Sequence, residues 1–245
     1  MRVAALADIH GNLPALEAVL AEVDREKPDL VVFCGDVASG PMPSETIDLL
    51  RTIKGARFVR GNADRGLIEA FDGHSPPQMP GPYADWAAAQ LDRPRRDFLA
   101  GFEPSVQIER ILFCHAVPAN DTDVFTVETP DDRVRELMRG VDADLVACGH
   151  THMQFDRKIE AVRVVNAGSV GMTYGKPGAC WAMLGPGVDL RRTDYDRQAA
   201  AGLIREKDWP SAESFARDNV ISVPSEEEAM EFMRAQEVKQ AEARG

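Results

Sequence analysis

The chain of 245 residues is short of positive charge. Lys and Arg number 28 against 40 Asp and Glu, which gives a formal net charge of -12 at pH 7. Because proteins hold long nucleic acids and anionic membranes mainly through clustered Lys and Arg, this balance argues against both as partners. It leaves open an anionic small substrate, since a few bound cations can reverse the local field.

Long apolar runs are also missing. No window approaches the roughly 18 apolar residues of a membrane span, and the first apolar run reaches Asp8 too soon for the core of a signal peptide. The four cysteines are widely spaced without a CxxC pair, and each lies in or beside an apolar run: Cys34, Cys114, Cys148 and Cys180. This spacing predicts buried, reduced thiols of a cytoplasmic protein, and it supports neither a disulfide framework nor a thiolate zinc site.

What the chain does contain is a regular alternation of short apolar runs and helical periodicity, which is typical of an α/β domain. Apolar runs predict strands at residues 2–7, 30–34, 56–59, 106–108, 111–114, 144–148, 162–165, 180–184 and 188–192. Helices are expected after Asn12 and Ser44, which can cap them, around Trp86, and at residues 130–139. Loops are expected at the Pro-rich residues 72–82 and the polar residues 116–130.

From about residue 195 the chain becomes charged and helical. Three predicted helices follow, at residues 196–206, 209–217 and 225–242. The last of them would place three apolar side chains on one face, those of Ala229, Phe232 and Met233. We expect residues 1–195 to form one domain and residues 196–245 a helical extension that packs on it. The charged helices also leave a partner surface or a homo-oligomer open.

The apolar runs share one feature, because most of them end in residue types that bind metal ions. In chain order these residues are Asp8, His10, Asp36, Asn62, His115, His150, His152 and Asn166. In open α/β folds the carboxyl ends of the strands meet at one crevice, so residues far apart in the chain are expected to come together there. Four of the five histidines belong to this set.

The donor set indicates which ions would bind. Carboxylates, amide oxygens and imidazoles without a thiolate suit Mn, Fe or Zn better than Ca. Without Asn166 the set has seven ligands, which are too many for one tetrahedral ion but fit two ions that share a bridging carboxylate. Two ions about 3.5–4 Å apart form a clamp for transferring a phosphoryl group to water. The residues therefore indicate a phosphoester hydrolase.

The same residues lie in five blocks that resemble those of the calcineurin-like metallophosphoesterase superfamily: D-x-H, G-D, G-N-x-(D/E), H and G-H-x-H. The chain reads DIHGN at 8–12, GD at 35–36, RGNAD at 60–64, CHAVP at 114–118 and GHTH at 149–152, in the family's order. NAGS at 166–169 is similar to a further block of the small prokaryotic members. The resemblance covers roughly residues 1–195. It implies two packed mixed β-sheets flanked by helices, a four-layer αββα sandwich.

The resemblance also implies roles for single residues. Asp8, His10 and His152 would hold one divalent ion. Asn62, His115 and His150 would hold the other, and Asp36 would bridge the two. A hydroxide held between the ions would attack phosphorus in line, with Asp36, Asn62 and His115 as catalytic residues and Asp64 orienting a metal ligand. The ions are expected to be Mn, Fe, Zn or Ni, with Mn active in vitro.

One position departs from the family's pattern. Many members carry His after the Gly-Asn pair, where it helps to protonate the leaving group, and this chain has Ala63 there. The departure argues for substrates with good leaving groups or for an acid supplied from elsewhere. His74, in the Pro-rich loop, either supplies that acid or is a solvated loop histidine.

Two further residues are candidates for binding the substrate. Asn12 opens a predicted helix, where backbone N–H groups could face a phosphate. Arg60 could reach a phosphate, or it could pair with a surface carboxylate. Asn166 and Ser169 are expected to brace the metal site through hydrogen bonds.

Two alternatives to a small-molecule phosphoesterase stay open at this point. A nuclease could use the same centre, but it would need a basic groove, which the net charge of -12 disfavours. Some members of the superfamily are protein-binding scaffolds that have lost ligands. Here every ligand position is filled, so a scaffold role would have to coexist with a metal site.

Overall fold

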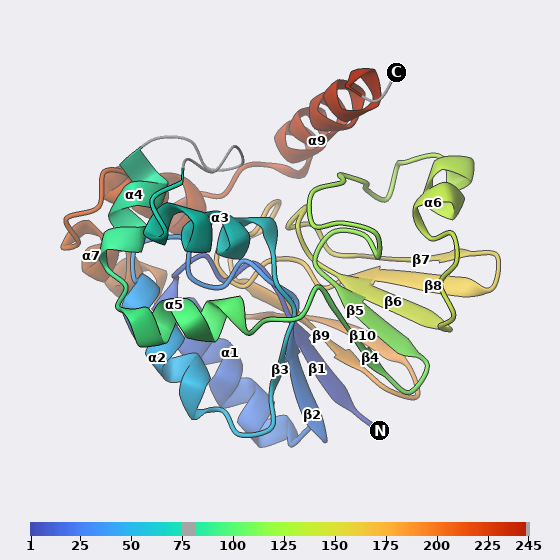
Figure 1. Cartoon of the computed structure of the whole chain (residues 1–245), viewed down its shortest axis with the longest axis horizontal. Helices are drawn as coiled ribbons and strands as arrows, with labels where there is room; N and C mark the ends of the chain where they lie inside the picture. The colour runs from blue at the N-terminus through green and yellow to red at the C-terminus, as the bar shows by residue number, and fades with distance from the viewer. Residues whose placement is uncertain (75–81, 244–245) are drawn as a thin grey trace.

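The computed structural model describes residues 1–74 and 82–243, in which the strands form two five-stranded sheets (Figure 1). The first sheet has the strand order β10-β9-β1-β2-β3. Its members are β1 (Val3–Leu6), β2 (Leu30–Phe33), β3 (Arg57–Phe58), β9 (Ala179–Leu184) and β10 (Val188–Thr193). The strands β1, β2 and β3 are parallel, and the hairpin of β9 and β10 adds antiparallel to β1.

The second sheet has the order β4-β5-β6-β8-β7. Its members are β4 (Ser105–Ile108), β5 (Ile111–Cys114), β6 (Leu145–Cys148), β7 (Phe155–Ile159) and β8 (Val162–Asn166). The three central strands are parallel, and β4 and β7 lie antiparallel at the edges. The sequence pattern does not predict β7. The segment between its buried ends, Phe155 and Ile159, consists of three charged residues, which an edge strand tolerates because one side of it faces solvent.

Successive side chains along a strand point to opposite faces of the sheet, so each strand contributes to two separate cores. In β1 and the residue after it, Val3, Ala5 and Ala7 point into an apolar core between the two sheets, which also contains Phe113 and Val165. The residues between them, Ala4 and Leu6, point into a second core on the helical side. This arrangement confirms the expected fold of two packed mixed sheets flanked by helices.

The helices cover the outer faces of the sandwich (Figure 1). The helical core of the first sheet takes its side chains from α1 (Leu13–Glu26), α2 (Pro43–Thr52), α3 (Asn62–Phe71), α4 (Pro82–Ala89) and α5 (Arg93–Ala100). The outer face of the second sheet packs against α6 (Asp131–Leu137) and Phe125. Asn12 caps α1 as predicted, with its side-chain oxygen accepting from Ala15 N.

The C-terminal segment contains α7 (Arg197–Arg205), α8 (Ala212–Phe215), a π-helix η1 (Ala216–Ile221) and α9 (Glu226–Glu242). The apolar side chains of α7, α8 and η1 share a core with Met42, Leu13 and Met172 of the main domain. Helix α9 lies against the loop between β5 and α6, where Gln240 donates to the carbonyl of Thr122 and Arg234 pairs with Glu128.

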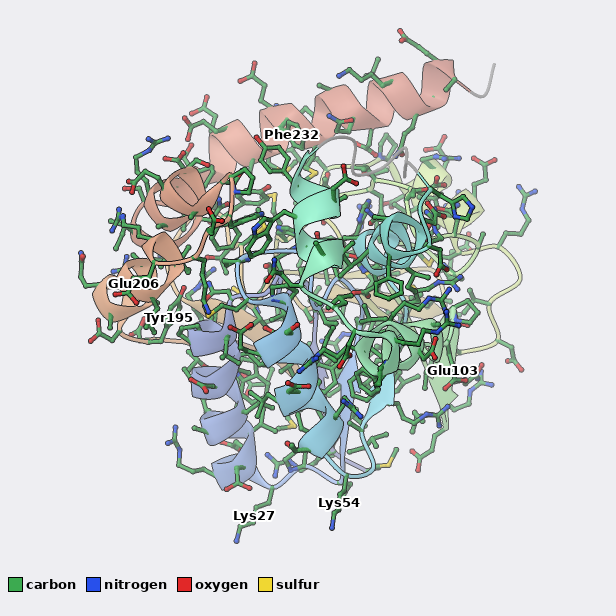
Figure 2. All side chains as sticks on the ribbon, turned by 60° about the vertical axis from the view of Figure 1, so that its left-hand side comes forward. Lys27, Lys54, Glu103, Tyr195, Glu206 and Phe232 are labelled. Atoms are coloured by element: carbon green, nitrogen blue, oxygen red, sulfur yellow. The ribbon has the colours of Figure 1, made fainter. Side chains whose placement is uncertain are left out.

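One expectation about α9 is wrong. Ala229 and Met233 are buried as predicted, but Phe232 is 54% exposed, and Met230 completes the buried stripe instead. A helix turns by about 100° per residue. Around the helix axis, Met230 and Phe232 therefore lie on opposite sides of Ala229. Figure 2 shows Phe232 on α9, far from Lys27 and Lys54 at the other end of the molecule.

The four cysteines are buried and free, as predicted. Among the described residues, no helix combines the length and the apolar character needed to cross a membrane. The predicted loop at residues 72–82 falls mostly outside the described residues. The predicted loop at residues 116–130 contains no helix or strand, only an isolated bridge between Val117 and Asn120.

The core between the sheets can be tested with Phe113→Ala. Phe113 is fully buried there, so truncation should leave a cavity and lower the free energy of unfolding by about 3–5 kcal/mol. Urea denaturation followed by circular dichroism measures the change. Val127→Ala, at a side chain that is 52% exposed, is the matched control and should change the stability little. Equal stabilities of the two variants would contradict this packing of the sheets.

Candidate metal centre

The candidate ligands follow the carboxyl ends of β1, β2, β5 and β6, and Asn62 begins α3 just after β3. Within each sheet, backbone hydrogen bonds join the loops that carry them, from Asp8 N to Gly35 O in the first sheet and from Gly149 N to His115 O in the second. Five ligands have left-handed backbone angles φ between 48° and 70°: Asp8, His10, Asp36, His150 and His152. Such angles cost free energy for residues with a Cβ, and they cluster at functional sites.

The first group of ligands is Asp8, His10 and His152. The Nε2 atom of His152 lies 3.4 Å from Asp8 Oδ1 and 3.2 Å from His10 Nε2. Asp8 Oδ2 accepts the backbone N–H of His150, whereas the buried Oδ1 has no hydrogen-bond partner. A buried carboxylate oxygen without a donor is costly, and a cation would satisfy it.

The second group is Asp36, His115 and His150, with Asn62 beside it. The Nε2 atom of His115 lies 3.3 Å from Asp36 Oδ2, 3.0 Å from Asn62 Oδ1 and 3.2 Å from His150 Nδ1. Asp36 Oδ1 is held by the N–H of Ala63, and Asp36 Oδ2 is also 3.9 Å from His10 Nε2 of the first group. The carboxylate of Asp36 therefore lies between the two groups.

Backbone carbonyls orient the four imidazole rings. In each ring one nitrogen lies near a carbonyl oxygen, which leaves the other nitrogen for the centre. These carbonyls belong to Ser39 for His10, Cys34 for His115, Thr122 for His150 and Met172 for His152. Donor atoms about 2.1 Å from a shared ion lie roughly 3.0–3.4 Å apart. The distances from His152 Nε2 and from His115 Nε2 to their neighbouring donors fall in this range, and His10 Nε2 lies farther from Asp8 Oδ1, at 4.0 Å. The residues present therefore fit two divalent ions.

Comparisons with known proteins agree with this geometry. The family model for the calcineurin-like phosphoesterase superfamily domain matches residues 1–185. The chain belongs to this superfamily. An uncharacterized protein of Methanocaldococcus jannaschii is 25% identical over 215 residues, which are 84% of each chain. The symmetrical bis(5'-nucleosyl)-tetraphosphatase of Yersinia enterocolitica is 29% identical over 145 residues, 57% of this chain and 48% of the relative.

Solved structures show the same fold. The metallophosphoesterase from Sphaerobacter thermophilus superposes with a TM-score of 0.76 at 24% identity, covering 91% of this chain and 100% of the other. A hypothetical protein from Pyrococcus horikoshii gives the same TM-score at 20% identity, with 91% and 99% of the two chains covered. Membership in the superfamily makes the protein a phosphoric ester hydrolase of a metal-dependent family.

Asp64 of this phosphoesterase braces the turn that carries Asp36. Its buried side chain accepts the backbone N–H groups of Asp36, Val37 and Gly61 at 2.8, 2.9 and 3.0 Å. Three donors fix the turn that presents Asp36, and the orienting role of Asp64 toward a metal ligand stays a prediction. Asn166 and Ser169 act in the same way, since Asn166 donates to the carbonyl of Gly149 and Ser169 to that of Asp8.

The buried carboxylates and imidazoles of the centre shift one another's pKa. Burial alone would raise the pKa of Asp8 and Asp36, but His152 beside Asp8 and His115 beside Asp36 outweigh it and lower both. Burial opposes a charge on His115 too, yet Asp36 raises its pKa to about 10, whereas burial and His115 lower the pKa of His150 to about 4. Burial and then Asp36 raise the pKa of Asp64 to about 7. Metal binding would displace the proton of His115, because a ligating imidazole is neutral.

The structure does not bring the candidate substrate-binding residues to the centre. Asn12 is fully buried, and its amide donates to Gly171 O and Tyr195 Oη. Arg60 lines a separate small cleft with Arg65 and Asp121, and its Nε has no hydrogen-bond partner. His74 is exposed just after α3 and is not among the described residues that line the pocket over the ligands. Substrate binding by these three residues stays a prediction.

The pocket over the ligands contains residues that the sequence motifs missed. It has a volume of about 500 Å³, and its floor includes His10, Asp36, Asn62 and Ala63. Its other lining residues come mostly from the C-terminal segment: Trp209, Ser211, Ser214, Phe215, Asp218 and Asn219, with Ser39, Tyr83 and Met172. No motif marks these residues, and a helical periodicity alone cannot show which face lies over a site.

The close approach of Gly61 to Asp36 gives a test of the centre. A Cβ built on Gly61 would lie 2.0 Å from Asp36 Oδ1, so Gly61→Ala should displace the carboxylate of Asp36 and weaken Mn binding by about 10–100-fold. Isothermal titration calorimetry of the metal-free protein with Mn measures the affinity. Gly187→Ala is the matched control, because a Cβ at that position would meet nothing within 4 Å. Unchanged Mn affinity in folded Gly61→Ala protein would contradict the role given to Asp36.

Proposed function

We propose that the chain hydrolyses small phosphate esters at a centre of two divalent metal ions. The observation that carries the proposal is the pair of ligand groups with the carboxylate of Asp36 between them. Asp8, His10 and His152 would hold one ion, and Asn62, His115 and His150 the other. The oxygen and imidazole donors accept Mn, Fe, Zn or Ni, and we expect Mn to support activity in vitro.

Bound in this way, the two ions would activate water and neutralise the charge that develops on the phosphoryl group. The residues of the chain hold the ligands of these ions in position. Asp64 holds the turn of Asp36, and the carbonyls behind the imidazoles hold each ring in one orientation. Ala63 lines the pocket but carries no proton donor, so the chain suits esters whose alcohols leave readily.

The size of the pocket and the charge of the chain support a small substrate. A cavity of about 500 Å³ lies in the range of small-molecule sites, and the net charge of -12 disfavours a long nucleic acid. The name of the relative from Yersinia enterocolitica also describes an enzyme of small phosphate compounds. We further propose that residues 196–245 belong to the same domain. The apolar side chains of α7, α8 and η1 share a core with Leu13 and Met42, and α9 contacts the main domain through Gln240, which donates to Thr122 O.

A metal-dependent screen tests the function. Protein stripped with EDTA should hydrolyse neither p-nitrophenyl phosphate nor bis-p-nitrophenyl phosphate, and Mn, Ni or Zn should restore activity. Asp36→Ala and His150→Ala each remove a ligand of the second ion, so each should lower the restored rate more than about a hundredfold. Elemental analysis should find two ions per chain before these substitutions and fewer after them.

Lys54→Ala supplies the control, because Lys54 is exposed at the end of the molecule away from α9 (Figure 2). It should keep the full rate and both ions. Activity that survives in the double variant Asp36→Ala/His150→Ala would rule out the two-metal centre. Two bound ions without turnover of any ester would instead favour a binding role for the same residues.

A further inference from the structure

The pocket over the metal centre has two walls of different origin. The ligands form the first wall, and residues of the segment 209–219, between α7 and the end of η1, form the second wall. The family model ends at residue 185, so this second wall lies outside the part of the chain that defines the superfamily. A phosphoryl group bound at the ligands would therefore direct its ester oxygen and leaving group toward residues of the C-terminal segment.

The second wall is mostly aromatic and uncharged, with Asp218 as its charged lining residue. Trp209 and Phe215 line it in edge contact, with ring centroids 5.3 Å apart, and the 46% exposed Tyr83 lines the pocket with them. The hydroxyls of Ser211 and Ser214 and the amide of Asn219 supply hydrogen-bonding groups. Aromatic surfaces with a few neutral polar groups suit a planar ring that carries heteroatoms.

The π-helix η1 contributes to this wall. It spans Ala216–Ile221 and directly follows α8, and its residues Asp218 and Asn219 line the pocket. π-Helical turns are uncommon and are found frequently at functional sites. The irregular geometry therefore agrees with a role for this segment in binding.

Positive side chains are missing from the pocket. No Lys or Arg is among the described residues that line it, and the carboxylate of Asp218 on the second wall is paired with Arg217. Polyphosphate sites use Lys or Arg to balance the additional charges. The metal ions would balance one phosphoryl group here, and nothing on the opposite wall would balance a second.

We propose that residues 209–219 form the leaving-group subsite, and that the substrate is an ester of one phosphoryl group with an alcohol that carries a planar aromatic or heterocyclic ring. The inference rests on the proposed function. Water adds to phosphorus and the P–O ester bond breaks, which gives phosphate and the ring-bearing alcohol, with the proton of water passing to the alcohol oxygen. Trp209 acts as a specificity residue that contacts the ring.

Substrate selectivity of the Mn-loaded full chain tests the subsite. We expect kcat/KM for adenosine monophosphate and phenyl phosphate to exceed that for glycerol phosphate and for adenosine diphosphate. Stacking of one ring on one aromatic side chain is worth about tenfold or more, so Trp209→Ala should reduce the preference for phenyl phosphate over glycerol phosphate at least about tenfold. The change should appear mainly in KM, because Trp209 touches the leaving group rather than the phosphoryl group.

Two further variants keep the test decisive. Ser214→Trp fills the subsite from an exposed position without removing the contact between Trp209 and Phe215, and it should lower the same preference. Phe232→Ala removes an aromatic side chain of the extension that does not line the pocket, and it should keep the preference. An unchanged preference in both Trp209→Ala and Ser214→Trp would overturn the subsite, as would faster hydrolysis of adenosine diphosphate than of the monophosphate.

Binding of adenosine separates this inference from the proposed function. Adenosine carries no phosphate, so its binding does not require the metal ions, and it should quench tryptophan fluorescence of the metal-free chain. The quenching should be lost in Trp209→Ala and retained in Phe232→Ala. If Trp209→Ala alone loses the quenching and the protein hydrolyses no ester, the subsite is supported and the proposed function is contradicted. Absence of adenosine binding to the original chain would overturn the subsite even if esters are hydrolysed.

Discussion

The backbone hydrogen bonds that join the loops at the carboxyl ends of the strands are the constraint on which the centre depends. Asp8 N donates to Gly35 O, His10 N to Asp36 O and Gly171 N to Asp8 O, so each loop holds the next at a distance of one hydrogen bond. Such contacts leave no room for side chains between the loops. A Cβ on Gly171 would lie 1.9 Å from the carbonyl oxygen of Ile9. The ligands are therefore positioned by the main chain, and the left-handed angles at five of them follow from this crowding.

The same constraint explains how much of the site can be predicted from the sequence. Asp8, Asp36, His115 and His150 follow apolar runs, and the ends of parallel strands must meet at one edge, so the pattern alone brings them together. The edge strand β7 and the exposure of Phe232 escape prediction, because both depend on what packs against the segment rather than on its own composition. Trp209 escapes for the same reason, since its place over the centre is set by the docking of α8 and η1.

Electrostatics and packing act together in the centre. Burying Asp8 and Asp36 costs free energy unless positive charge compensates, and the neighbouring histidines supply part of it. The compensation is incomplete, because Asp8 Oδ1 keeps no donor and His150 resists protonation beside His115. Divalent ions would supply the positive charge that the buried carboxylates still lack, and the four imidazoles could then all be neutral. A chain with a net charge of -12 can in this way present a positive site to a phosphate.

The C-terminal segment lies next to the metal centre at two places. Residues 209–219 form the wall of the pocket, and Gln240 of α9 donates to the carbonyl of Thr122, the same carbonyl that lies 3.2 Å from His150 Nε2. Residues 209–219 would contact the leaving group. Gln240 would affect the orientation of His150, because both bind the same carbonyl. Because both come from outside residues 1–185, which the family model matches, the C-terminal segment can change what is bound while the loops of the sandwich keep the chemistry constant.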